Sequence, residues 1–340
     1  MPEPAVLLAG VMVMSLTAYV LLGGADYGGG VWDLLAHGET VASQRATIAR
    51  AIAPVWEANH VWLILVVTVL FNAFPPAFAR LSVALHIPLA LMLLGIVLRG
   101  SAFVFRAYGP ADERYARRWG MVFAVASAVT PLMIGATVGA ITEGRIPRGT
   151  VPFRQLYVDP WLTPFSIAVG VFALVLFAYL AAVYLTLEAR ERETVEAFRR
   201  RALGSAVATG VMAVVVFALA GNAQHVRAAL SDSPWALPLH LATAICAVAA
   251  LIFLWTRQFW WARIAAAAQV SLIVWGWALA QYPYLVRPDV TIAGSAAPAS
   301  VLVLLLQVLA AGAVLLLPAL VYLFRIFGPR TGFDGRGRQA

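Results

Sequence analysis

Three charged residues stand inside otherwise apolar stretches of the sequence and are the first candidates for chemistry. Asp26 lies in GGADYGGGVWD, Glu57 in PVWEANHVWLI and Arg99 in LRGSAFVFR. A charged side chain at the centre of a bilayer costs at least about 3 kcal/mol, so such groups face the protein interior or water and often mark ion or proton pathways. The two acids are therefore the main functional candidates.

The composition places these residues in a membrane protein. Of 340 residues, 62% are hydrophobic and only 12% are charged, whereas about a quarter of a soluble protein is charged. The formal charge of +8 comes from arginines between apolar runs, as in the loops of membrane proteins, so we expect no nucleic-acid partner. The single cysteine, Cys246, excludes a disulfide or multi-thiolate metal site within the chain, and we predict no metal site.

Nine apolar segments are long enough for transmembrane helices of about 20 residues. The sequence therefore predicts an all-α polytopic membrane protein in which the first eight helices form two four-helix bundles and the ninth stands alone. The predicted parts are a first bundle with the acidic motifs (1–141), an external loop (142–162), a second bundle (163–282), and the ninth helix with a cytoplasmic tail (283–340). The nine segments are 5–32, 47–73, 79–105, 118–141, 163–187, 202–221, 237–255, 260–282 and 300–327.

The distribution of arginines predicts the orientation in the membrane. Counted with the adjoining ends of the segments, the connections after the first, third, fifth and seventh segments and the C-terminal tail hold 17 arginines, and the other connections hold 6. Because cytoplasmic loops carry the excess of positive charge, we expect the N-terminus outside and the C-terminus in the cytoplasm.

This orientation predicts that the three charged residues lie at a similar depth. Asp26 falls in the inner half of the first span, and Glu57 lies two to three turns above the inner end of the second. Arg99 is about 10 Å above Arg106 in the third span, at about 1.5 Å per residue. A cluster of this kind suits a proton half-channel open to the cytoplasm, or a structural ion pair that holds three helices together. Spacing alone leaves both open.

Side chains near Glu57 have several interpretations. His60 follows by three residues and so shares a helical face with it; it would extend a proton relay, bind haem, or be a hydrogen-bonded packing residue. Trp56 and Trp62 flank the acid and indicate packing, an interfacial belt, or the edge of a haem or quinone.

Residues near Asp26 are expected to serve packing. The consecutive glycines at 28–30 favour close helix contact. Asp33, one heptad beyond Asp26, lies near the inner surface; it would mark the mouth of a channel or simply be exposed, and exposure is favoured.

Taken together, these motifs resemble subunit II of cytochrome bd quinol oxidases. The family pattern Asp-Gly-x-Asp-x-Gly-x-Gly is similar to residues 23–30, and Pro-x-Trp-Asp-Gly-Asn-x-Val-Trp-Leu is similar to residues 54–63. Similarity continues in LFNAFPPAFA (70–79) and RGSAFVFR (99–106) and extends over essentially the whole chain.

The resemblance implies a subunit of a quinol oxidase in a prokaryotic inner membrane. Its partner, subunit I, would hold low-spin haem b, high-spin haem b, haem d and the quinol site, and small accessory subunits and membrane lipid would complete the complex. Quinol would be oxidised on the outer side and dioxygen reduced to water with protons from the cytoplasm. This chain would bind no haem and no covalent cofactor.

The resemblance also implies roles for particular residues. Asp26 and Glu57 would carry protons, Arg99 would tune them, and His60 would extend the relay. Trp56, Asn59 and Trp62 would lie near a haem or the subunit interface and are the candidate cofactor contacts.

Three departures from the family pattern predict a divergent branch. Gly23 replaces an acid, Glu57 replaces an aspartate, and Val104 replaces a common glutamate. Two other functions remain. A purely structural assembly subunit is compatible with the sequence, whereas a transporter is disfavoured because no internal repeat pairs two broken helices.

Overall fold

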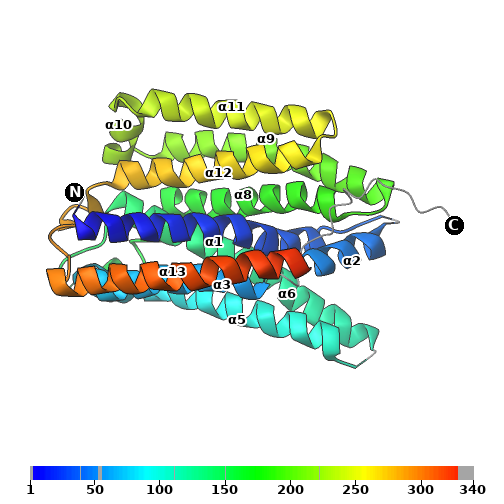
Figure 1. Ribbon diagram of the computed structural model, residues 1–340, viewed down its shortest axis with the longest axis horizontal. Coiled ribbons are helices and arrows are strands. Elements are labelled where there is room, and N and C mark those ends of the chain that lie inside the picture. The colour runs from blue at the N-terminus through cyan, green and yellow to red at the C-terminus, as the bar shows by residue number, and fades with distance from the viewer. Residues whose placement is uncertain are drawn as a thin grey trace.

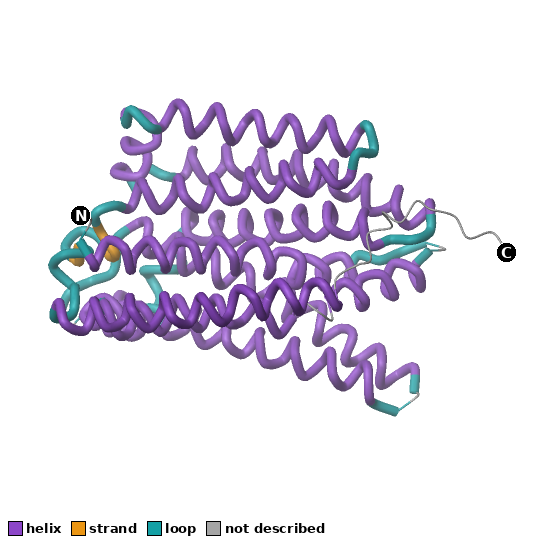
Figure 2. Tube along the Cα trace, viewed as in Figure 1, coloured by secondary structure: helices purple, strands orange, loops and turns teal. Residues whose placement is uncertain are grey.

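The computed structural model describes residues 3–38, 40–52, 56–110, 112–149, 151–221 and 223–327. These ranges are almost entirely helical (Figure 1), and Figure 2 shows one small pair of strands at one end. The long helices are α1 (Pro4–Leu34), α3 (Trp56–Ala73), α5 (His86–Tyr108), α6 (Glu113–Glu143), α8 (Pro164–Glu188), α9 (Arg192–Leu219), α11 (Ala236–Trp255), α12 (Phe259–Gln281) and α13 (Ala299–Phe327). The short elements are α2 (Val41–Ile52), α4 (Pro75–Ala84), α7 (Phe153–Tyr157), α10 (Gln224–Asp232), β1 (Tyr284–Val286) and β2 (Val290–Thr291).

Most of the long helices are able to cross a membrane. In the described ranges, eight are long and apolar enough, namely α1, α5, α6, α8, α9, α11, α12 and α13. The pair formed by Asn59–Ala73 and α4 adds a ninth candidate, although its two parts are bent by 119°. The prediction of an all-α polytopic membrane protein is confirmed, and the predicted nine spans are the upper count.

The third predicted span begins later than expected. Within the segment 47–73, α2 ends at Ile52 and α3 begins at Trp56, and residues 53–55 lie outside the described ranges; one continuous helix over this segment stays a prediction. The segment 79–105 is divided into α4 and α5, and the long helix starts at His86.

At the centre of the molecule, α1 and α8 pack side by side (Figure 1). Helices α3, α5, α6 and α13 lie on one side of them, and α9, α11 and α12 lie on the other. In the most apolar part of each helix, 61% of the residues are buried in α8 and only 6% in α13. Helix α8 is thus a core helix, and α13 leaves most of its surface to other contacts. The two-bundle division stays a prediction.

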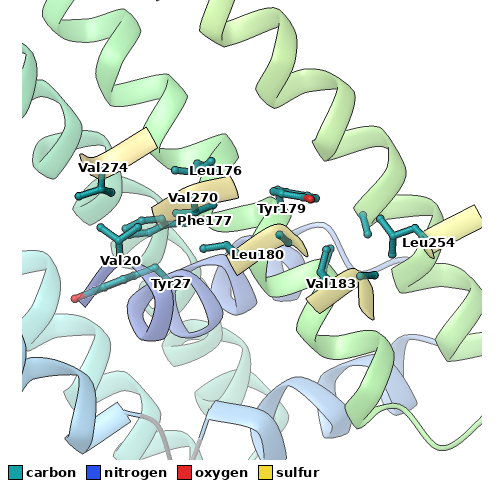
Figure 3. Close-up of a cluster of buried hydrophobic side chains, with 14 of the residues drawn as sticks. Val20, Tyr27, Leu176, Phe177, Tyr179, Leu180, Val183, Leu254, Val270 and Val274 are labelled. Carbon is teal, nitrogen blue, oxygen red and sulfur yellow. The ribbon is translucent and has the colours of Figure 1, made fainter. Parts of the chain in front are cut away.

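Two glycines let α1 approach α8 closely. A Cβ atom at Gly28 would lie 2.0 Å from the carbonyl oxygen of Phe177, and one at Gly24 would lie 2.5 Å from Leu180 Cδ1. Figure 3 shows Tyr27 of α1 beside Phe177 in the resulting cluster. Small residues permit the van der Waals contact that holds membrane helices together, so the packing interpretation of the glycines is confirmed.

The strands lie at the end of the molecule where α1 begins (Figure 2). They form an antiparallel pair in which Tyr284 faces Thr291. Beside them, Asp289 accepts from Arg80 of α4 at 2.7 Å and pairs with Arg148 at 2.8 Å. This end is extracellular in the predicted orientation, which stays a prediction.

Candidate functional site

The structure brings Asp26 of α1 and Arg99 of α5 together in a buried ion pair. Arg99 Nη1 donates to Asp26 Oδ2 at 2.7 Å, and Nη2 donates to Oδ1 and, at 2.9 Å, to the Asp26 carbonyl oxygen. Asp26 is 0% exposed and Arg99 is 1% exposed. Because the guanidinium is a rigid fork, two parallel bonds fix the orientation of both groups.

Helix α6 completes the surroundings of Arg99. Its Nε donates to Ser127 Oγ at 2.9 Å, and the Ser127 hydroxyl donates to the Phe123 carbonyl oxygen at 2.7 Å. The guanidinium carbon lies 4.9 Å from the ring centroids of both Tyr27 and Phe123, within cation–π range. The sequence did not point to Ser127 or Phe123, because it does not reveal which face of α6 meets Arg99.

A second ion pair lies one heptad along the same two helices. Arg106 Nη1 donates to Asp33 Oδ2 at 2.8 Å, and Arg45 of α2 lies 3.3 Å from Asp33 Oδ1. The expectation that Asp33 is exposed is wrong, since only 4% of it is accessible. Its two arginines cover it, and the Arg106 guanidinium also faces Phe123 at 5.7 Å. The sequence did contain a signal for this pair, because Asp26 and Asp33 have the same spacing as Arg99 and Arg106.

Glu57 lies in the first turn of α3, but its side chain is outside the described part of the chain, as is that of Trp56. Its expected depth, two to three turns above the inner end of the span, and its approach to Asp26 therefore stay predictions. Two residues later, Asn59 packs against Gly23, one turn before Asp26.

Asn59 and Trp62 point toward the interior of the chain. Asn59 is 0% exposed, and Trp62 packs against the cluster between α1 and α8. Among the described residues, Asn59 Nδ2 and Oδ1 have no hydrogen-bond partner. The indole Nε1 of Trp62 has none either. A role for either residue at a haem or a subunit interface stays a prediction.

His60 lines a groove between α3 and α5. The groove has a volume of about 580 Å³, and its other lining residues all come from α5: Ile96, Val97, Gly100, Ser101, Val104 and Phe105. Its walls are mostly apolar, which suits lipid or another helix. The relay, haem-ligand and packing interpretations of His60 all remain predictions.

The residues of this groove do not fit a haem held on both faces. Haem iron in proteins takes His, Cys, Met or Tyr as axial ligands, and His60 is the only such residue in the lining. Across the described ranges, no three His, Cys, Asp or Glu side chains gather where they could hold a metal ion.

Fold and site together define a polytopic helical membrane protein with a carboxylate–guanidinium pair buried among its first helices. The family model described as cytochrome bd terminal oxidase subunit II matches residues 4–327. The chain belongs to this family. It is a multi-pass membrane subunit of a bacterial bd-type quinol oxidase complex, whose partner is subunit I.

Several relatives are similar over much of the chain. Cytochrome bd ubiquinol oxidase subunit 2 of Bacillus subtilis is 27% identical over 260 residues, which are 75% of this chain and 74% of that protein. A putative cytochrome bd menaquinol oxidase subunit II of the same organism is 23% identical over 91% of both chains. Cytochrome bd-I ubiquinol oxidase subunit 2 of Escherichia coli K12 is 28% identical over 63% of this chain and 55% of its own length.

A solved structure has the same fold. The bd oxidase of Geobacillus thermodenitrificans contains a chain that matches with a TM-score of 0.80 at 21% identity. The match covers 95% of this chain and 98% of that chain. The arrangement of helices described above is therefore that of a bd oxidase chain.

Proposed function

We propose that this chain is the haem-free second subunit of a quinol:oxygen oxidoreductase and that it supplies part of a proton path from the cytoplasm. Subunit I holds haems b and d, and the complex oxidises quinol and reduces dioxygen to water. Small accessory subunits and membrane lipid contact the chain. The buried Asp26–Arg99 pair carries the proposal, because charges inside a membrane are retained chiefly where they serve ion or proton movement.

The geometry of the pair suggests how the work is divided. Arg99 provides three hydrogen bonds to Asp26, and these hold its carboxylate in place between α1 and α5. Glu57 is the carboxyl that receives the proton first, and Asp26 is the next carrier. Arg99 balances the negative charge of Asp26 between proton transfers. His60 extends the relay along α3.

The proposal is tested by Glu57→Gln in the assembled complex. The amide keeps the size of the side chain and cannot release a proton, so we expect oxygen consumption with excess quinol to fall on the order of a hundredfold. Turnover is normalised to haem content from a reduced-minus-oxidised spectrum. The spectrum itself is expected to stay unchanged.

The matched control is Glu193→Gln, at an exposed position in the first turn of α9, which is expected to leave turnover unchanged. Normal turnover in Glu57→Gln would remove the proton role. Loss of the haem spectrum would favour the second candidate, a purely structural assembly subunit. The fixed, stacked geometry of Arg99 speaks for that candidate, because such a pair also joins helices.

A further inference from the structure

We propose that a groove between α5 and α6 binds an anionic phospholipid, with an acyl chain in the groove and the phosphate at Arg117 and Arg118. The proposal does not depend on the proton path. Helices α5 and α6 pack side by side, and their joined ends stand apart from the other helices at the lower right of Figure 1. The other helices of this chain therefore leave this edge uncovered.

The groove has small, buried residues at its floor and large, exposed residues in its walls. Gly95 and Ala126 are buried, whereas Leu94, Met121 and Val125 are 53%, 55% and 49% exposed. The volume is about 320 Å³. A ligand with polar groups would find no hydrogen-bond partner here, so the groove suits a hydrocarbon chain. The lining is entirely apolar and consists of Leu91, Leu94, Gly95, Leu98, Met121, Val122, Val125, Ala126 and Val129.

Two arginines continue the groove-facing side of α6. Arg117 and Arg118 lie one turn before Met121 and Val122, so they share a helical face with these two groove residues. Both arginines are exposed, and no carboxylate in the described part of the chain pairs with either of them. A guanidinium binds a phosphate through two parallel hydrogen bonds. The charge at this end of the groove therefore complements the headgroup of an anionic lipid.

The length of the site matches one leaflet of a bilayer. Val129 follows Arg118 by 11 residues, or about 16 Å of helix at about 1.5 Å per residue, and half of a hydrocarbon core is about 15 Å. Trp119 lies between the arginines and the groove and stacks near Phe105, with ring centroids 4.5 Å apart. Aromatic residues are enriched at the headgroup level. A phospholipid fits this length, whereas a crossing helix of subunit I would need a contact surface over both leaflets.

The groove lies on the helix pair that holds the buried guanidinium. Leu98 in its wall precedes Arg99, and Ala126 at its floor precedes Ser127, whose Oγ accepts from Arg99 Nε at 2.9 Å. An acyl chain in the groove adds van der Waals contact to both helices at the level of this bond. The lipid therefore supports the packing of α5 against α6.

The first test measures lipid binding to the purified complex after removal of its native lipid. Phosphatidylglycerol in detergent is titrated in, and bound lipid is counted by native mass spectrometry. We expect the double variant Arg117→Gln, Arg118→Gln to bind one phosphatidylglycerol more weakly than the unaltered complex, on the order of tenfold. Phosphatidylcholine with the same acyl chains is the neutral comparison and should not distinguish the two complexes.

The matched control is the double variant Arg190→Gln, Arg192→Gln, which removes the same charge from exposed positions at the start of α9. Its affinity for phosphatidylglycerol is expected to equal that of the unaltered complex. An equal affinity for both double variants would overturn the phosphate site.

Photolabelling tests the position of the acyl chain. Phosphatidylglycerol with a diazirine at the middle of one chain is reconstituted with the unaltered complex, and the labelled peptides are identified. We expect labels within 91–98 and 121–129. Val125→Trp adds a large ring to the groove wall and should lower this labelling, whereas Val211→Trp, at a 57% exposed position of α9, should not.

The remaining outcomes also decide the proposal. Labels confined to subunit I or to other helices would overturn the groove as the site of the acyl chain. An electron cryo-microscopy map with a helix of another subunit in the groove would do the same. If the altered complexes fail to assemble, photolabelling of the unaltered complex decides, because it needs no substitution.

Discussion

At the scale of single residues, Ser127 adds a further constraint on the buried guanidinium. Its Oγ accepts from Arg99 Nε at 2.9 Å, beside the two bonds from the guanidinium to the Asp26 carboxylate. In this position the guanidinium lies over the rings of Tyr27 and Phe123. A lysine has no planar fork, so it cannot replace these contacts.

Ser127→Ala is expected to destabilise the complex by about 1–3 kcal/mol, because it leaves a buried Nε–H of Arg99 without an acceptor. Thermal unfolding of the purified complex, followed by haem absorbance, measures the change. Ser271→Ala is the control, since Ser271 donates only to a carbonyl of its own helix. Equal melting temperatures for the two variants would show that the bond to Arg99 contributes nothing.

At the scale of elements, the glycines of α1 allow close contact with two neighbouring helices, α8 and α6. Gly28 faces the backbone of α8, and a Cβ atom at Gly30 would lie 2.1 Å from Ser127 Oγ on α6. The same helix turn therefore sets the distance to α8 and leaves room for the hydroxyl that holds Arg99. Helix packing and site geometry are coupled through α1.

Gly28→Ala is expected to lower the stability of the complex by about 1–3 kcal/mol or more, because the added carbon meets the rigid backbone of α8 and the helices must separate. Recovery of haem-containing complex and its melting temperature measure the effect. Gly10→Ala adds the same methyl group to α1 in open space. If both variants behave alike, the close approach of α1 and α8 is not required.

The limits of sequence reasoning also appear at this scale. The length of the apolar segments predicted the membrane-spanning helices. The depth of Asp26 and Arg99, each judged from its position within its own helix, predicted that the two residues meet. The division of 79–105 into α4 and α5 was missed because a continuous apolar run hides the helix boundary before His86. The burial of Asp33 was missed because it depends on Arg45 and Arg106 from two other helices. Ser127 likewise depends on which face of α6 turns inward.

At the scale of the whole molecule, ion pairs join distant segments at the end opposite the buried arginines. Arg80 of α4 donates to Asp289 and to the Ile146 carbonyl oxygen, both at 2.7 Å, and Arg148 also binds Asp289. Partial burial tends to raise the pKa of Asp289, but hydrogen bonds from Arg80 and Arg148 outweigh it and lower the pKa. The turn between β1 and β2 is thereby tied to α4 and to the segment after α6.

The lowered pKa predicts the pH range in which this contact stabilises the protein. Its contribution is complete above the ordinary value of 3.8 and is lost as the pH falls through the lower value of the folded state. We therefore expect the complex to melt at a higher temperature than its Asp289→Asn variant above about pH 5, with the difference closing in stronger acid. Asp232→Asn, at an exposed position, should show no such trend. A difference that is independent of pH would contradict the assignment.

The repeat of the two ion pairs bears on how the first helix finds its place during insertion. The two acids, at 26 and 33, and the two arginines, at 99 and 106, are both seven residues apart. If α1 shifted by seven residues along α5, one acid would still lie opposite an arginine. Charge alone therefore permits a wrong register. Such a slip would bring Leu21 or Leu35 to the place of Gly28, against the Phe177 carbonyl oxygen, where even one added carbon finds no room. Gly28 thus excludes, by steric clash, a helix register that the ion pairs alone would allow.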